Sequence, residues 1–264
     1  MNCECLVLII FAAIGWFFPS AAASASNRPS AAELAAITER GRILAEYDTA
    51  AWQATDAVTA AHPKVGSTGR YIARKTLAGW VVDFGRLNGT GDRFLVAYEA
   101  VQTGSSTHFE ARSFQPMRED TGWNLAAAKG IETAMRSFHG ASRAYNIAVF
   151  PAEREGIYVY LYPAQIKNGI YLLGADVRYR ISSDGMKVLE KRQMHKSIIE
   201  YGQPGPQDMV SSGYHTHILS DLPEDTDVFL VLVRRPRVPE VVGAGAYIFT
   251  IGVDGKITIE NRLK

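Results

Sequence analysis

The residues of this chain with the clearest chemical potential lie between His215 and Asp227. One residue separates His215 from His217, and in a β-strand residues i and i+2 point to the same face, so the two imidazoles would lie side by side. Two neutral imidazoles at this spacing, completed by a carboxylate, form a ligand set that zinc accepts. Asp221 and Asp227 follow in the sequence and are the candidate carboxylates. The sequence therefore contains a candidate zinc site built from His215, His217, Asp221 and Asp227.

The segment from His215 to Asp227 is similar to the His-x-His segment of JAMM-type zinc peptidases. In that family a proline follows the second histidine, and a later Ser-x-x-Asp opens a helix. In this chain Ile218 stands in place of the proline, Glu224 stands where the serine is expected, and a strand is predicted directly after Asp227. The resemblance implies zinc-dependent hydrolysis, and the three departures count against it because a short motif needs its structural context.

Two other interpretations of the same segment stay open. Both histidines could lie on a solvated or half-buried strand face, hydrogen-bonded to carboxylates of the next loop. Ser220 and Asp221 beside His217 are the residue types of serine catalysis, but the chain has no Gly-x-Ser-x-Gly turn, which that chemistry normally uses. His195 is a further candidate ligand, on condition that the fold brings it close.

The elements that must position these residues follow from hydrophobic periodicity. Apolar residues recur at threes and fours over residues 30–61 and 121–138, which predicts two helices. The first begins at Ser30, which forms a capping box with Glu33. Its predicted buried stripe comprises Leu34, Ile37, Leu44, Ala51, Trp52, Thr55 and Val58.

Alternating apolar and polar residues, separated by Gly, Asn and Asp turns, predict strands in the rest of the chain. We expect an antiparallel meander after Tyr71, strands at 145–150, 157–163, 170–181 and 186–198, and later strands at 214–219, 228–233, 246–251 and 256–260. This order predicts an α+β fold with a long N-terminal helix and a second helix packed on antiparallel meander sheets.

Residues 1–25 have the pattern of a secretory signal peptide. A 13-residue apolar run from Leu6 to Phe18 is too short to span a bilayer, and small residues follow it. Cleavage is expected after Ala25, with Ala23 as the alternative, and an uncleaved anchor is the other interpretation of the run. The predicted mature chain, 26–264, is a single α+β domain with a possible sub-boundary near 140–145. We expect an exported protein, periplasmic or secreted, with no membrane span after cleavage.

The composition narrows the classes of function. Both cysteines, Cys3 and Cys5, lie in the predicted leader, so the mature chain would have neither disulfides nor a thiol nucleophile. The 28 Lys and Arg nearly balance the 27 Asp and Glu, whereas nucleic-acid-binding proteins normally carry a basic excess. Nucleic acid is therefore not an expected partner.

The order of the predicted strands from Ile157 onward, with the Gly255 hairpin near the C-terminus, resembles that of uncharacterised exported bacterial proteins. That resemblance implies no activity. The sequence favours a non-catalytic protein that binds an unidentified protein or small-molecule partner without a cofactor. The alternative is a metal-dependent hydrolase with zinc at His215 and His217.

Overall fold

The computed structural model describes residues 28–63, 66, 68–104, 107–202, 205 and 210–262. The predicted signal peptide, residues 1–25, and its cleavage site at Ala25 lie outside the described residues. In the part that is described, no helix is both long enough and apolar enough to cross a bilayer.

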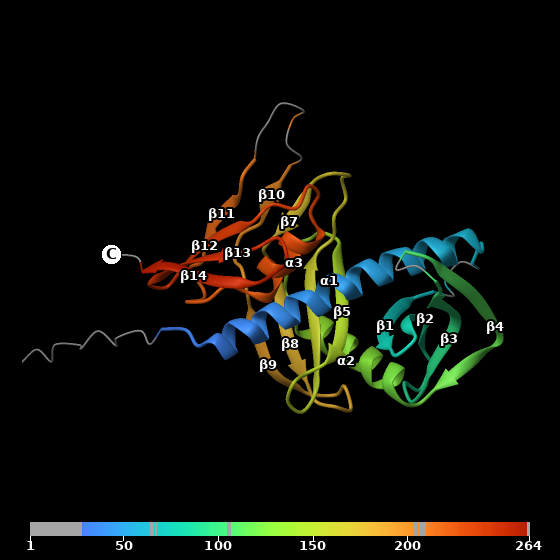
Figure 1. The fold of residues 1–264 in the computed structure, drawn as a ribbon. Coiled ribbons are helices and arrows are strands. Elements are labelled where there is room, and N and C mark those ends of the chain that lie inside the picture. Colours follow the sequence, from blue (N-terminus) through green and yellow to red (C-terminus); the bar gives the residue numbers. More distant parts are fainter. Residues whose placement is uncertain are drawn as a thin grey trace, which may run out of the picture.

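The predicted α+β class is confirmed (Figure 1). The helices of the described residues are α1 (Ala31–Ala60), α2 (Trp123–Ser137) and α3 (Asp225–Val233). The strands are β1 (Arg70–Thr76), β2 (Gly79–Leu87), β3 (Phe94–Gln102), β4 (Phe109–Asp120), β5 (Tyr145–Pro151), β6 (Ile157–Pro163), β7 (Tyr171–Leu173), β8 (Val177–Ile181), β9 (Val188–Gln193), β10 (Ile199–Tyr201), β11 (Gly213–Thr216), β12 (Glu240–Ala244), β13 (Tyr247–Ile251) and β14 (Ile257–Arg262).

The strands form three four-stranded sheets and one two-stranded sheet. The first sheet is the predicted meander β1-β2-β3-β4, the second has the order β5-β6-β8-β9, and the third has the order β11-β12-β13-β14. The two-stranded sheet pairs β7 with β10. All of these pairings are antiparallel except β11 with β12, which is parallel.

Helix α1 runs across the molecule and connects its two ends (Figure 1). Near its start, Leu34 and Ile37 pack in a small apolar core with the third sheet and α3. From Leu44 to Val58 its buried face packs in the larger core, which includes residues of the first two sheets. One helix therefore contributes to both cores.

The predicted start of α1 is confirmed by its capping box. The Glu33 N–H donates to the Ser30 hydroxyl over 3.2 Å, and the Ser30 N–H donates to the Glu33 carboxylate over 2.9 Å. Most of the predicted stripe is buried, but Trp52 is 68% exposed and Thr55 is also exposed. Gly41 lies so close to α3 that an added Cβ would stand 2.5 Å from the Asp225 carbonyl oxygen.

The prediction of a strand at 228–233 is wrong, because these residues belong to helix α3. The segment is almost entirely apolar and rich in β-branched residues, and a short run of this kind suits a buried helix as well as a buried strand. The residues of its first turn, Asp225, Thr226 and Asp227, are buried. Tertiary burial and capping by Glu224 decide the conformation.

The predicted strand at 170–181 is interrupted. Gly174 and Ala175 have φ angles of +107° and +51°, which end the extended backbone and separate β7 from β8. The two pieces join different sheets. The interruption leaves Asp176 directly before β8, where it becomes part of the site. Strand β12, which the sequence did not predict, pairs with the strand that carries His215.

Candidate metal centre

His215 lies on β11, and His217 follows directly after its end. β11 is the outer strand of its sheet, and the His217 N–H extends its pairing with β12 by donating to the Gly243 carbonyl over 2.8 Å. Because the backbone stays extended across both residues, their side chains point to the same side. The two imidazole centroids lie 5.1 Å apart.

Asp227 faces these imidazoles from the first turn of α3. Glu224 is the N-cap of this helix, and its N–H donates to Asp227 Oδ2 over 2.7 Å. The backbone N–H of Asp227 in turn donates to the Glu224 carbonyl over 3.1 Å. Asp227 is 0% exposed. The start of the helix therefore fixes the carboxylate in place.

The third imidazole belongs to His195, beyond the end of β9. The predicted strand at 186–198 is too long, since β9 ends at Gln193. Asp176 Oδ1 accepts both the backbone N–H of His195, over 3.0 Å, and its Nδ1, at 2.9 Å. The interruption between β7 and β8 thus positions His195, which the sequence named only as a conditional ligand.

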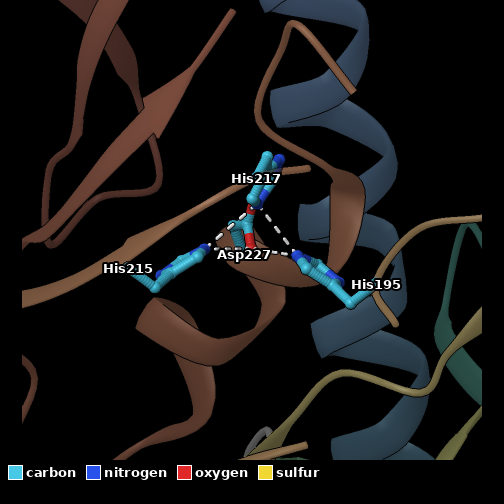
Figure 2. Close-up of side chains that lie close together, drawn as sticks. All are labelled: His195, His215, His217 and Asp227. Atoms are coloured by element: carbon cyan, nitrogen blue, oxygen red, sulfur yellow. Dashed lines mark hydrogen bonds and ion pairs between the residues drawn. The ribbon is translucent and has the colours of Figure 1, made fainter. Parts of the chain in front are cut away.

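These four residues form what we call the imidazole cluster: His195, His215, His217 and Asp227 (Figure 2). His217 Nε2 lies 2.9 Å from His195 Nε2 and 3.1 Å from His215 Nε2. Asp227 Oδ1 lies 3.1 Å from both His195 Nε2 and His215 Nε2, and Oδ2 lies 3.1 Å from His217 Nε2. Tetrahedral zinc with bonds of about 2.0–2.1 Å holds its ligand atoms about 3.3 Å apart. The cluster is close to that size.

The outward-facing nitrogens of His217 and His195 are both hydrogen-bond donors. His217 Nδ1 lies 2.9 Å from the Leu222 carbonyl oxygen, which can only accept, so Nδ1 carries the proton. His195 Nδ1 faces the Asp176 carboxylate, with oxygens at 2.9 and 3.1 Å. In its neutral form, each ring therefore presents the lone pair of Nε2 to the centre of the cluster.

His215 follows the same rule. Its Nδ1 lies 2.9 Å from Glu240 Oε1, and this carboxylate is held by the Tyr201 hydroxyl at 2.8 Å and by Arg234 Nη1 at 2.7 Å. Carboxylate and carbonyl partners of this kind fix the tautomer and orientation of metal-binding histidines. All three Nε2 atoms, with the Asp227 carboxylate, can donate electron pairs to one cation.

In the metal-free cluster, protons carry the positive charge that the carboxylates require. Burial lowers the pKa of His195, but the charges of Asp176 and Asp227 outweigh burial and raise this pKa to about 11. Burial also lowers the pKa of His215, while hydrogen bonds to Asp227 and Glu240 raise it to about 9. Burial raises the pKa of Asp227, but the facing imidazoles hold it well below its usual range. His195 and His215 therefore each carry a second ring proton at neutral pH, and one divalent cation carries the same charge as these two protons.

Asp221, the other predicted carboxylate ligand, does not belong to the imidazole cluster. It is exposed and lies beside Gly245. The hydroxyl of Ser220 donates to the Leu222 carbonyl over 2.6 Å and accepts from Arg192 Nη2 at 3.4 Å. Neither interaction directs this hydroxyl to His217, so the arrangement does not favour a serine nucleophile there.

A second buried cluster is centred on Asp225, two residues before Asp227 in the sequence. Asp225 Oδ1 accepts from Arg40 Nε over 2.9 Å, and Oδ2 accepts from Arg178 Nη1 over 2.5 Å and from the Tyr160 hydroxyl over 2.9 Å. We call Arg40, Tyr160, Arg178 and Asp225 the guanidinium cluster. It attaches the start of α3 to α1, β6 and β8, and so supports the helix that carries Asp227.

Comparisons of the chain with protein-family models, with curated proteins and with solved structures gave no match. The interpretation of the imidazole cluster therefore depends on its chemistry.

Proposed function

We propose that this chain is a zinc-binding protein in which His195, His215, His217 and Asp227 hold one Zn²⁺. The observation that carries the proposal is the convergence of three Nε2 atoms on one carboxylate, with every Nδ1 bound to an acceptor outside the cluster. Buried histidines with a purely structural role do not need their Nε2 atoms to face one another. Zinc would account for this arrangement, since it accepts imidazole and carboxylate ligands in tetrahedral geometry.

The number and burial of the ligands favour a structural zinc. Structural zinc sites use four protein ligands, whereas catalytic sites leave one position for water. The side chains of His195, His215, His217 and Asp227 are at most 9% exposed. The ion would join three segments: the end of β9, the β11 region and the start of α3. In this proposal the protein is non-catalytic and binds a partner, protein or small molecule, that remains to be identified.

A metal-dependent hydrolase is the second candidate, and one observation favours it. Asp227 lies in the first turn of a helix that begins after the His-x-His strand, as in the JAMM-type pattern, so one of the three departures is removed. In this mode only His215, His217 and Asp227 hold the metal. His195 does not bind it, so the fourth position is open to water. Zinc would supply a polarised water as nucleophile.

Metal analysis of untagged protein tests the main proposal. We expect about one zinc per chain, retained through dialysis and lost in the His215→Ala and Asp227→Asn variants. Asp221→Asn is the matched control, because Asp221 is an exposed carboxylate of the same segment, and it should keep its zinc. Metal-free wild-type protein that takes up no Zn²⁺ would contradict the proposal.

The role of His195 separates the two candidates. If the zinc is structural, His195→Ala weakens zinc binding, and the Co²⁺-substituted wild type has the visible spectrum of a tetrahedral site without water. If the zinc is catalytic, His195→Ala keeps the metal, and the cobalt spectrum changes with pH as bound water ionises. Hydrolysis of a peptide library by the zinc form, abolished by Asp227→Asn, would establish the second candidate.

We also propose that the protein is exported, on the basis of the apolar run and small residues in positions 1–25. Expression of the full chain with a C-terminal tag, followed by N-terminal sequencing of the product outside the cytoplasm, tests this. A first residue of Ser26 is expected. An intact N-terminus on cytoplasmic protein would contradict it.

A further inference from the structure

A pocket of about 490 Å³ lies away from the imidazole cluster. Its walls come from one face of α1, from the β1–β2 hairpin with the end of β3, and from the segment that follows α3. Small side chains on α1, Ala45 and Ala50, leave the space, and Leu232 and Trp80 add apolar surface. This volume is within the range of small-molecule sites, which combine apolar walls with a few polar groups.

Three arginines line this pocket, and none of them has a carboxylate partner among the described residues. They are Arg42, Arg235 and Arg237. Nine other arginines of the described residues form ion pairs with carboxylates, such as Arg70 with Glu132. Lys75 and Glu46 also line the pocket, but they pair with each other at 2.5 Å. The pocket therefore has three positive charges that the described residues do not neutralise.

Backbone carbonyls hold these guanidinium groups in place. Arg235 Nη1 donates to the carbonyls of Leu232, Val233 and Arg234 over 2.9–3.0 Å. Arg237 Nε donates to the Leu232 carbonyl over 2.9 Å. The two side chains thus cap the C-terminus of α3. A guanidinium has five N–H donors, so fixing one nitrogen leaves others for a ligand.

Arg42 approaches from the opposite wall. Its Nη2 donates to the Asp254 carbonyl over 3.2 Å, and it lies on the same face of α1 as Ala45 and Glu46. A carbonyl partner orients the guanidinium without cancelling its charge. Cations from two walls of one pocket, each already oriented, need little ordering when an anion binds.

We propose that this pocket binds a phosphorylated small molecule. Planar guanidinium groups match the geometry of phosphate oxygens and bind them through paired, charge-assisted hydrogen bonds. Three of them suit a group with more than one negative charge, such as a pyrophosphate, better than a single carboxylate. The apolar surface of Leu232 and Trp80 would contact the rest of the molecule. This site is independent of the zinc proposal because it shares no residue with the imidazole cluster.

Calorimetric titration of the full chain with inorganic pyrophosphate tests the proposal. Dialysis of the protein against buffer without free zinc keeps zinc from binding pyrophosphate and leaves any bound zinc in place, and 150 mM NaCl suppresses nonspecific attraction. Saturable binding of about one pyrophosphate per chain is expected. Arg235→Gln with Arg237→Gln should weaken it at least about tenfold, since each lost charged hydrogen bond costs about that factor.

Two further variants keep the test decisive. Arg42→Gln does not touch the α3 carbonyls, so it should weaken binding by about tenfold in a chain that melts like wild type. Arg86→Gln removes an exposed arginine outside the pocket and should leave binding unchanged. Absence of saturable binding, or an equal loss in Arg86→Gln and Arg42→Gln, would overturn the proposal.

Discussion

Two carboxylates on the first turn of α3 are buried to the same extent but have different partners. Asp225 faces the side chains of Arg40 and Arg178, and Asp227 faces three imidazoles. Both carboxylates are 0% exposed. An arginine is protonated at every pH that a folded protein experiences, whereas a histidine titrates and also binds metals.

The difference assigns the two clusters different roles. The guanidinium cluster carries its own positive charge, so Asp225 is paired without a proton or a metal ion from the solution. The imidazole cluster must take its positive charge from protons or from a metal ion, so its contribution depends on pH and on zinc. We infer that Asp225 fixes the position of α3 and that Asp227 uses this position for binding.

The largest expected effect is the loss of stability when the guanidinium cluster is broken. Asp225→Asn leaves Arg40 and Arg178 without the carboxylate between them, and breaking a buried ion pair in this way costs about 3–5 kcal/mol. We expect this loss in the free energy of unfolding, measured by urea denaturation, with and without zinc. Asp221→Asn, at an exposed position of the same segment, should change stability by less than about 0.5 kcal/mol. Similar losses in the two variants would argue against the role of Asp225.

The second-largest expected effect is the change in melting temperature with zinc, which should depend on the imidazole cluster and not on the guanidinium cluster. An ion that binds only the folded state at 100 times its dissociation constant stabilises the protein by about 2.7 kcal/mol. We therefore expect added Zn²⁺ to raise the melting temperature of metal-free wild type, and EDTA to reverse the change. Asp227→Asn should not respond. If Asp225→Asn still folds, its own melting temperature should rise with zinc. An equal response in Asp227→Asn and wild type would show that zinc acts elsewhere.

The sequence predicted the parts of the site that depend on local geometry. The i, i+2 spacing placed His215 and His217 on one side of an extended segment, and Asp227 was among the candidate carboxylates. Asp221 was an equal candidate, because the sequence alone does not show where the loop ends and the helix begins. The apolar residues after Asp227 fit a strand, and the N-cap at Glu224 became visible only in the structure.

The rest of the site depends on contacts between distant segments. His195 reaches the cluster because Asp176 binds it. Asp176 can face His195 because the extended backbone is interrupted at Gly174. Glu240 supports His215 from β12, a strand the sequence did not predict. The glycine was a visible sign of the break, but nothing local connects it with a histidine some twenty residues later. The long helix and the α+β class, in contrast, followed from periodicity and capping.

The pH dependence of zinc binding should follow the protons of His195 and His215. The pKa values of about 11 for His195 and about 9 for His215 mean that both rings are protonated at pH 7, and zinc must displace both protons. We expect about two protons released per zinc, measured by calorimetry in buffers of different ionisation enthalpy. The apparent zinc affinity should rise by about 100-fold per pH unit from pH 6 to 8.

The stability of the metal-free protein should fall as the pH rises, whereas the zinc affinity should increase. Raised histidine pKa values stabilise the fold below about pH 6.5, the ordinary value, and this stabilisation is lost as the pH rises through 9 and 11. Metal-free protein should therefore lose stability in alkaline buffer, while zinc-loaded protein should not. A zinc affinity that does not change with pH would mean that these rings are neutral before the metal binds.

The smallest expected effect comes from the carboxylates behind the imidazoles. Glu240→Gln and Asp176→Asn keep the shape of each side chain but weaken the acceptors of His215 Nδ1 and His195 Nδ1, and such changes typically reduce metal affinity by about 10–100-fold. Competition with a chromophoric zinc chelator measures this loss. Asp176 also accepts the His195 backbone N–H, whereas the Glu240 carboxylate, which Tyr201 and Arg234 also bind, accepts only the ring N–H of His215. Asp176→Asn should therefore show the larger loss, because it alters both the position and the basicity of the ligand. Equal losses would mean that the backbone contact contributes nothing, and that the break at Gly174 positions His195 by itself.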